Sequence, residues 1–175
     1  DSYDPEYVII LSGDQICKQD YADFLRFHKE KGAEFSVAVM EVDWKEASRF
    51  GLMVADEDDR ITEFQEKPPV PKSNLASMGI YIFNWDILKK YLEEDEADPN
   101  SKNDFGMNII PALLRDGRKM YAYHFNGYWR DVGTIDSLWE ANMEVLDPEN
   151  SGIDIFDEKW KIYSRNPVLP AQKIG

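Results

Sequence analysis

The hydrophobic and polar positions in the first part of the chain follow a strand, helix, strand order. Val8 to Leu11 is a continuous apolar run ending in a polar turn, which is typical of a central parallel strand covered on both faces. Residues 20–31 carry apolar side chains at helical spacing, and Gly32 is a suitable helix end. Residues 35–42 are rich in β-branched side chains and predict a second strand. This order is a βαβ unit, so the pattern predicts an α/β fold with a right-handed crossover.

The middle of the chain predicts a hairpin followed by further strands and helices. Residues 52–55 and 60–65 have strand character and are joined by the acidic turn 56–59. The pattern also predicts strands at 77–83, 120–125 and 129–132, and helices at 87–92, 105–114 and 135–146. After Leu146 the helical period is lost and prolines recur, so residues 147–175 are expected to form a linker.

Composition and charge narrow the class of protein. A chain of 175 residues with 43% hydrophobic side chains can bury a real core. The formal charge of −14 repels nucleic acid and anionic lipid, so neither nucleic acid nor a membrane is expected as a partner. No apolar run approaches the ~20 residues that span a bilayer, and the single Cys17 cannot form an intrachain disulfide. The first residues carry neither an initiator methionine nor signal-peptide features, so we expect an internal piece of a cytoplasmic protein.

Two aspartates follow predicted strands and are candidate metal ligands. Asp14 comes directly after the first apolar run, and ligands of open α/β sheets bind beyond the carboxyl ends of strands. Carboxylates suit Mg²⁺, which binds one or two of them together with substrate phosphates. Asp131 ends a short apolar strand before Gly133. Alternatively, Asp14 is a turn residue bonded to its own backbone. Asp131 could likewise be a salt-bridged aspartate, or one that flanks a helix for which Thr134 is the better N-cap.

Glu66 and Lys67 stand at the end of a predicted strand, before a proline. A lysine there can hold a phosphate as a point charge, and a glutamate can accept hydrogen bonds from sugar hydroxyls. Alternatively, the pair is an exposed ionic edge that protects the strand. Gly51 lets a ligand approach the backbone closely, and Ser77 can donate to a phosphate or cap a turn.

Other chemistries lack their motifs. The two histidines are far apart in sequence, and no His and Cys cluster with metal-ligand spacing occurs. Neither a G-x-S-x-G nor a Walker-type motif is present. Asp104 is expected to cap its helix, and Cys17 to be a half-buried residue at a strand end.

Seven stretches, in one order, resemble the bacterial ADP-glucose pyrophosphorylases. They are LSGDQICKQDY, ASRFGLM, ITEFQEKP, SNLASMGIYIFNWDIL, NDFGMNIIP, YWRDVGTIDSLWEANM and IYSRNPVLP. The resemblance implies that residues 1–146 are the later part of a Rossmann-like nucleotidyltransferase domain. Residues 147–175 would then be a linker and the start of a left-handed parallel β-helix. The family's glycine-rich G-G-x-G-T-R-L segment and most of the β-helix are not in this sequence.

The resemblance implies a glucose-1-phosphate adenylyltransferase that makes ADP-glucose and pyrophosphate from ATP and glucose 1-phosphate. It implies a cytoplasmic, allosteric enzyme of glycogen synthesis, forming a homotetramer or a hetero-oligomer. Asp14 and Asp131 match the aspartates that hold the catalytic Mg²⁺. Lys67 matches the lysine on the phosphate of glucose 1-phosphate, which makes it the third catalytic residue.

The remaining matches concern the sugar-phosphate pocket, which Gly51, Glu66 and Ser77 would line together with Lys67. Gln15 departs from the family, which usually has histidine there, so an acid–base role at that position is not expected.

Three alternatives stay open. The protein could instead make UDP- or dTDP-glucose, although NDFGMNIIP and IYSRNPVLP favour the ADP-glucose branch. It could also be a non-catalytic regulatory subunit or a structural fragment. We expect the isolated chain to be inactive, because half a site cannot run the reaction.

Overall fold

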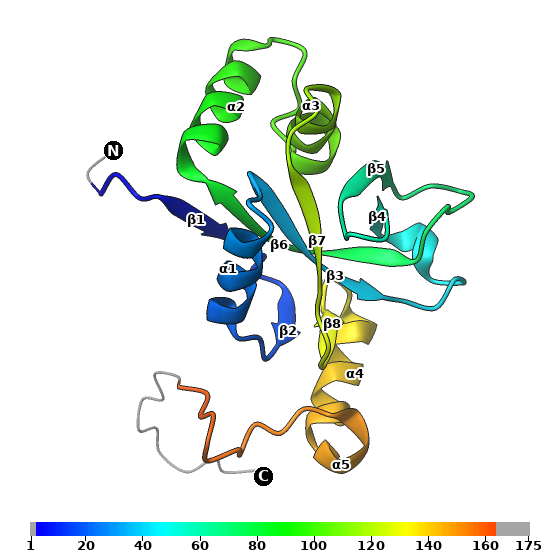
Figure 1. Ribbon diagram of the computed structural model, residues 1–175. Helices are drawn as coiled ribbons and strands as arrows, with labels where there is room; N and C mark the ends of the chain where they lie inside the picture. Colours follow the sequence, from blue (N-terminus) through cyan, green and yellow to red (C-terminus); the bar gives the residue numbers. More distant parts are fainter. Residues whose placement is uncertain (1–2, 164–175) are drawn as a thin grey trace. The chain divides into compact units, whose positions relative to one another are not determined.

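The computed structural model describes residues 3–163, which form two compact units. Of the described residues, unit 1 contains 3–13 and 19–126, and unit 2 contains 14–18 and 127–163. Each unit has its own sheet (Figure 1). Among the described residues, no helix is both long and apolar enough to cross a membrane.

Unit 1 is built on a six-stranded mixed sheet in which β5, β4, β6, β3 and β7 are neighbours in that order and β1 also pairs with β6. The strands are β1 (Tyr7–Ile10), β3 (Phe35–Glu41), β4 (Gly51–Ala55), β5 (Ile61–Glu66), β6 (Leu75–Asn84) and β7 (Met120–His124). Only β3 and β7 pair in parallel, and the other pairs are antiparallel. Both β1 and β3 run antiparallel to β6, so they are parallel to each other with β6 between them. The α/β class and the β4–β5 hairpin are therefore confirmed.

The prediction that the first apolar run is a central strand covered on both faces is wrong. Within residues 3–163, β1 pairs with β6 alone and antiparallel to it. Ile9 is 40% exposed and Leu11, just after the strand, is 48% exposed. A continuous run of four apolar residues shows no alternation of polar and apolar positions. Its sequence therefore cannot distinguish a central strand from one that is covered on one face only.

The helical segments of unit 1 are α1 (Tyr21–Glu30), a short 3₁₀ turn η1 (Ala47–Arg49), α2 (Trp85–Ala97), a π turn η2 (Phe105–Ile109) and α3 (Ile110–Arg115). Of these, α1 lies close to the expected residues 20–31, whereas α2 extends beyond the expected 87–92 at both ends and η1 was not predicted. Asp20 caps α1 by accepting from the backbone N–H of Ala22 at 2.8 Å. Asp104 caps the π turn by accepting from the N–H of Met107 at 2.7 Å, as expected. The prediction of one regular helix over residues 105–114 is wrong in its first half, because residues 105–109 form the π turn.

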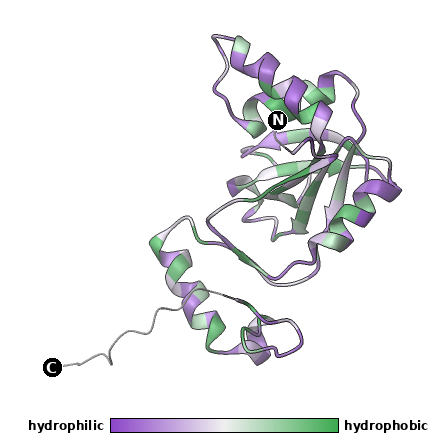
Figure 2. Ribbon diagram, turned by 90° about the vertical axis from the view of Figure 1, so that its left-hand side faces the viewer, coloured by the Kyte–Doolittle hydropathy of each residue, from purple (hydrophilic) through white to green (hydrophobic). Residues whose placement is uncertain are grey.

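The main core of unit 1 joins the sheet to α2 and α3. Its buried side chains are Phe35, Val37, Val39, Met53, Ile61, Phe83, Leu88, Tyr91, Ile109, Ile110, Leu113, Met120 and Ala122. In Figure 2 the strands of this unit are largely hydrophobic, whereas the outer side of the helix at the top of the view is hydrophilic. This one-sided pattern fixes which face of each helix packs on the sheet.

His28 is a buried structural histidine of α1 rather than a ligand. Its Nδ1 lies 2.8 Å from the Ser36 hydroxyl and its Nε2 lies 3.0 Å from Asn84 Oδ1. The side chain is fully buried, and this burial lowers the pKa of His28 below its ordinary value of 6.5. The folded protein therefore keeps His28 neutral at a pH where the unfolded chain would bind a proton.

We expect His28 to make unit 1 less stable in weak acid. Because its folded-state pKa is lowered, the unfolded state gains protons first, and the free energy of unfolding falls as the pH drops below 6.5. Chemical denaturation at pH 7.5 and pH 5.5 measures this slope. His28→Gln should flatten the slope, because the glutamine amide does not titrate. Equal slopes for wild type and His28→Gln would contradict the prediction.

Unit 2 contains a two-stranded antiparallel sheet and two helices. These are β2 (Gln15–Cys17), β8 (Trp129–Asp131), α4 (Ile135–Val145) and α5 (Pro148–Ser151). Thr134 and Ser137 cap α4 with a reciprocal capping box, so the expected N-cap is confirmed. Cys17 is the half-buried last residue of β2, as expected. The short strand β2 was not predicted.

The segment after α4 is mostly irregular up to residue 163, as a linker would be, apart from the short α5. Lys18 contacts this segment within unit 2: its Nζ lies 2.8 Å from Asp157 Oδ2 and 5.2 Å from the centre of a Trp160 ring. The expected start of a β-helix falls largely on residues 164–175, outside the described residues.

Candidate functional site

Pairing of β2 with β8 brings Asp14 and Asp131 together in unit 2. Gln15 lies opposite Asp131 in this pairing, and the N–H of Val132 donates to the Asp14 carbonyl at 2.9 Å. A Cβ built on Gly133 would lie 3.1 Å from Asp131 Oδ1 and 3.8 Å from Asp14 Oδ2. The two carboxylates therefore lie beside the same small space, which stays open because residue 133 is glycine.

This pair of carboxylates fits a magnesium ion better than a zinc ion. Within residues 3–163, no group of three or more His, Cys, Asp or Glu side chains could hold a metal by itself. Mg²⁺ needs only one or two carboxylates because it keeps water and takes phosphate oxygens as its other ligands. Asp131 Oδ1 also accepts from the N–H of Gly133 at 2.9 Å, which fixes the orientation of the carboxylate.

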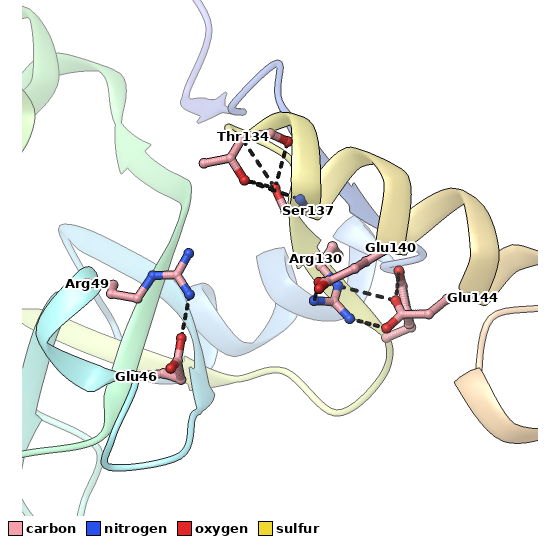
Figure 3. A network of polar contacts seen from close by, with 8 residues as sticks. Glu46, Arg49, Arg130, Thr134, Ser137, Glu140 and Glu144 are labelled. Carbon is pink, nitrogen blue, oxygen red and sulfur yellow. Dashed lines mark hydrogen bonds and ion pairs between the residues drawn. The ribbon is translucent and has the colours of Figure 1, made fainter.

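Arg130 anchors the strand that carries Asp131 to helix α4 (Figure 3). Its guanidinium donates to Glu140 Oε2 at 3.0 Å and, through Nε and Nη2, to the two oxygens of Glu144. The Tyr128 hydroxyl donates to Glu144 Oε2 at 2.6 Å. Burial alone would raise the pKa of Glu144, but hydrogen bonds from Tyr128 and Arg130 bring it below its ordinary value. These charge-assisted hydrogen bonds join the side chains of β8 and the residue before it to those of α4, and so fix the position of β8 against the helix.

Gln15, the residue after Asp14, has a structural partner on β8. Its Oε1 accepts from the indole N–H of Trp129 at 3.1 Å, so it joins β2 to β8 next to the carboxylate pair. An amide suits this role because it does not titrate.

The sugar-phosphate candidates lie in unit 1, where Gly51 pairs with Glu66 across β4 and β5. Lys67 leaves the strand with a left-handed backbone (φ +43°) and donates its N–H to the Phe50 carbonyl at 3.2 Å. Its Nζ then lies 3.8 Å from Glu66 Oε1. A non-glycine residue in this conformation costs of order 1 kcal/mol and is often found at functional sites. The exposed ion pair contributes little to stability, so the strain is not explained by that pair.

Ser77 belongs to the same region through Tyr81. Its Oγ accepts from the N–H of Gly79 at 3.2 Å and hydrogen-bonds the Tyr81 hydroxyl. Burial is the main cause that raises the pKa of Tyr81, and the nearby carboxylates of Asp104 and Glu66 raise it further. We call the set Gly51, Glu66, Lys67, Ser77, Tyr81 and Asp104 the Glu66 cluster.

Two members of this cluster were not candidates from the sequence. Tyr81 follows Ser77 and Gly79 at a period of two along β6, and all three are half-buried while Ala76, Met78 and Ile80 are buried. That alternation is the signal that could have found Tyr81. Asp104 was expected only as a helix cap, and no local pattern indicates that it also lies near Glu66 and Tyr81. The centre of the Phe105 ring lies 5.6 Å from the centre of the Tyr81 ring.

The structure thus groups the predicted residues into two sets, each within one unit. Asp14 and Asp131 form the carboxylate pair of unit 2. Gly51, Glu66, Lys67 and Ser77 belong to the Glu66 cluster of unit 1.

Comparison with known proteins agrees with the motif resemblance. Over 175 residues the chain is 66% identical to a glucose-1-phosphate adenylyltransferase of Clostridium beijerinckii and covers 45% of its length. It is 64% identical to the enzyme of that name from Clostridium acetobutylicum, covering 46% of it, and 60% identical to one from Desulforamulus reducens, covering 44%. The chain therefore spans less than half of these relatives. The family described as nucleotidyl transferase matches residues 1–148, and its Rossmann-like fold agrees with the mixed sheet. The chain therefore belongs to the nucleotidyl transferase family.

Proposed function

We propose that this chain is part of a glucose-1-phosphate adenylyltransferase, which makes ADP-glucose and pyrophosphate from ATP and α-D-glucose 1-phosphate. The observation that carries the proposal is the pairing of β2 with β8, which brings Asp14 and Asp131 to the same space beside Gly133. The printed names of the relatives support the choice of nucleotide and sugar.

In this reaction a phosphate oxygen of glucose 1-phosphate attacks the α-phosphorus of ATP, the bond to the β-phosphate oxygen breaks, and pyrophosphate leaves. Both reactants are anions, so positioning and charge neutralisation account for most of the catalysis. Lys67 would hold the phosphate of the attacking sugar, because its ammonium reaches out of the strand on a left-handed turn and stays exposed. Glu66 would accept hydrogen bonds from sugar hydroxyls, with Ser77 lining the same region. No protein nucleophile is needed.

Asp14 and Asp131 would hold a Mg²⁺ ion between the protein and the ATP phosphates. When bound, such an ion neutralises phosphate charge and stabilises the charge that builds up on the α-phosphoryl oxygens. The protein's own part is to hold both carboxylates beside the same space. The β2–β8 pairing brings them there, and the Arg130 network anchors the strand that carries Asp131 to α4.

The wider assignments follow from the same proposal. Residues 1–146 would be the later part of the catalytic domain, and residues 147–175 a linker entering a left-handed parallel β-helix. The complete enzyme would be an allosteric homotetramer or hetero-oligomer of the cytoplasm that serves glycogen synthesis.

A nucleotide competition assay on the intact protein tests the proposal. With glucose 1-phosphate and Mg²⁺, ATP should support pyrophosphate release with a kcat/KM about 100-fold above that of UTP or dTTP. Preference for UTP or dTTP would identify another sugar-nucleotide pyrophosphorylase. Inactivity with all three nucleotides would instead indicate a regulatory subunit.

A further inference from the structure

The Glu66 carboxylate lies in a narrow gap between two glycines from different elements. Gly51 begins β4, and Gly106 is the second residue of the π turn. A methyl carbon built on Gly106 would lie 2.9 Å from Glu66 Oε2, and one built on Gly51 would lie 3.1 Å from the same oxygen. Carbon and oxygen atoms in contact normally stay about 3.3 Å or more apart. The carboxylate can occupy the gap because neither residue has a side chain.

The two glycines differ in what else a side chain would meet. At Gly51 the new carbon would also lie 3.0 Å from two atoms of the Phe64 ring, which packs against the main core. At Gly106 the same ring is 3.4 Å away and Asp104 Oδ1 is 3.3 Å away, so the closest overlap, at 2.9 Å, is with the end of the flexible Glu66 side chain. Gly106 is not among the glycines with positive φ, so alanine can adopt its backbone. Alanine is also the better helix former.

The π turn places Gly106 at this point. Asp104 accepts from the N–H of Met107 with its carboxylate, and its carbonyl accepts from Asn108 at 2.9 Å and from Ile109 at 3.4 Å. The hydrogen bond from Ile109 to Asp104 spans five residues instead of the four of an α-helix, which defines a π turn. Such turns are frequent at functional sites. The turn therefore carries Asp104 and Gly106 to the same carboxylate, Glu66.

We propose that Gly106 is a positioning residue that keeps open the space in which the Glu66 carboxylate is fixed for hydrogen bonding to a hydroxyl of the sugar phosphate. This rests on the proposed function of the Glu66 cluster. The gap gives the two carboxylate oxygens different surroundings. Oε2 faces the glycines, and Oε1 lies on the side of Lys67, at 3.8 Å from its Nζ. A side chain at 106 would rotate the carboxylate out of this arrangement and leave the fold in place.

Gly106→Ala in the intact protein tests whether Gly106 positions the Glu66 carboxylate or is needed for folding. The KM for glucose 1-phosphate should rise about tenfold, as expected for loss of a charge-assisted hydrogen bond. The KM for ATP should stay unchanged, and the melting temperature should stay the same or rise. Met107→Ala is the matched control, because Met107 follows in the same turn and is 52% exposed. It should change neither KM.

A double-mutant cycle shows whether Gly106 acts through Glu66. Glu66→Ala alone should raise the KM for glucose 1-phosphate, and adding Gly106→Ala to it should cause no further loss. Additive losses would overturn the inference, and so would an unfolded Gly106→Ala or an equal loss for both substrates. If Glu66→Ala leaves the KM unchanged, the proposed function of the cluster fails. If only Gly106→Ala leaves it unchanged, the positioning role alone fails.

Discussion

Asp131→Asn is expected to lower kcat of the intact protein about a hundredfold or more, because the charge that would hold the metal accounts for several kcal/mol of transition-state stabilisation. Asparagine has the same shape as aspartate, and its oxygen can still accept from the N–H of Gly133, now at 2.9 Å. The turn and strand β8 should therefore stay folded. Asp14→Asn should have an effect of similar size, because both carboxylates border the same space.

Pyrophosphate release measured over a series of Mg²⁺ concentrations distinguishes a metal ligand from a structural aspartate. Each variant should need more Mg²⁺ for half-maximal rate, and the double variant should lose less than the product of the single losses. Asp136→Asn is the matched control, since Asp136 is an exposed aspartate in the first turn of α4. Unchanged turnover of Asp131→Asn and Asp14→Asn would point to a regulatory, non-catalytic subunit.

Local sequence signals predicted the elements whose stabilising contacts are local. The caps Asp104 and Thr134 and the acidic turn of the β4–β5 hairpin each depend on residues a few positions apart. Strand β2 has only three residues and pairs with β8, far along the chain, so it leaves no local pattern. The same pairing is what joins Asp14 to Asp131. The spacing of residues in the sequence therefore could not predict that Asp14 and Asp131 lie close together, and only the family resemblance implied it.

The Glu66 cluster shows the same limit in a different form. Glu66 and Lys67 are neighbours in sequence, and their chemistry allowed either a sugar-phosphate site or an exposed ionic edge, between which the family resemblance decided. Tyr81 and Asp104 come from β6 and the start of the π turn, and only the packing of these elements places them near Glu66. The sequence of the π turn looks like that of an ordinary helix. A single extra residue per turn shifts the spacing of apolar residues too little to be detected in so short a segment.

Lys67→Met should raise the KM for glucose 1-phosphate about 10- to 150-fold, the range for loss of a hydrogen bond to a charged group. Methionine keeps an unbranched stem of similar length without the charge. Because Lys67 is exposed and its pair with Glu66 is long, at 3.8 Å, the melting temperature should hardly change. The KM for ATP should stay as it is, since the lysine is assigned to the sugar phosphate.

Lys72→Met tests whether any exposed lysine of this region would have the same effect. Lys72 follows the same strand and pairs with Glu63 at 2.7 Å, outside the Glu66 cluster, so its loss should leave both KM values unchanged. Lys67→Arg should restore only part of the affinity, because a planar fork does not replace a compact ammonium on a left-handed turn. An equal rise in both KM values for Lys67→Met would mean that the lysine contributes a general positive field. In that case the strained backbone at Lys67 would have to be explained by the turn before Pro68 alone, without a phosphate.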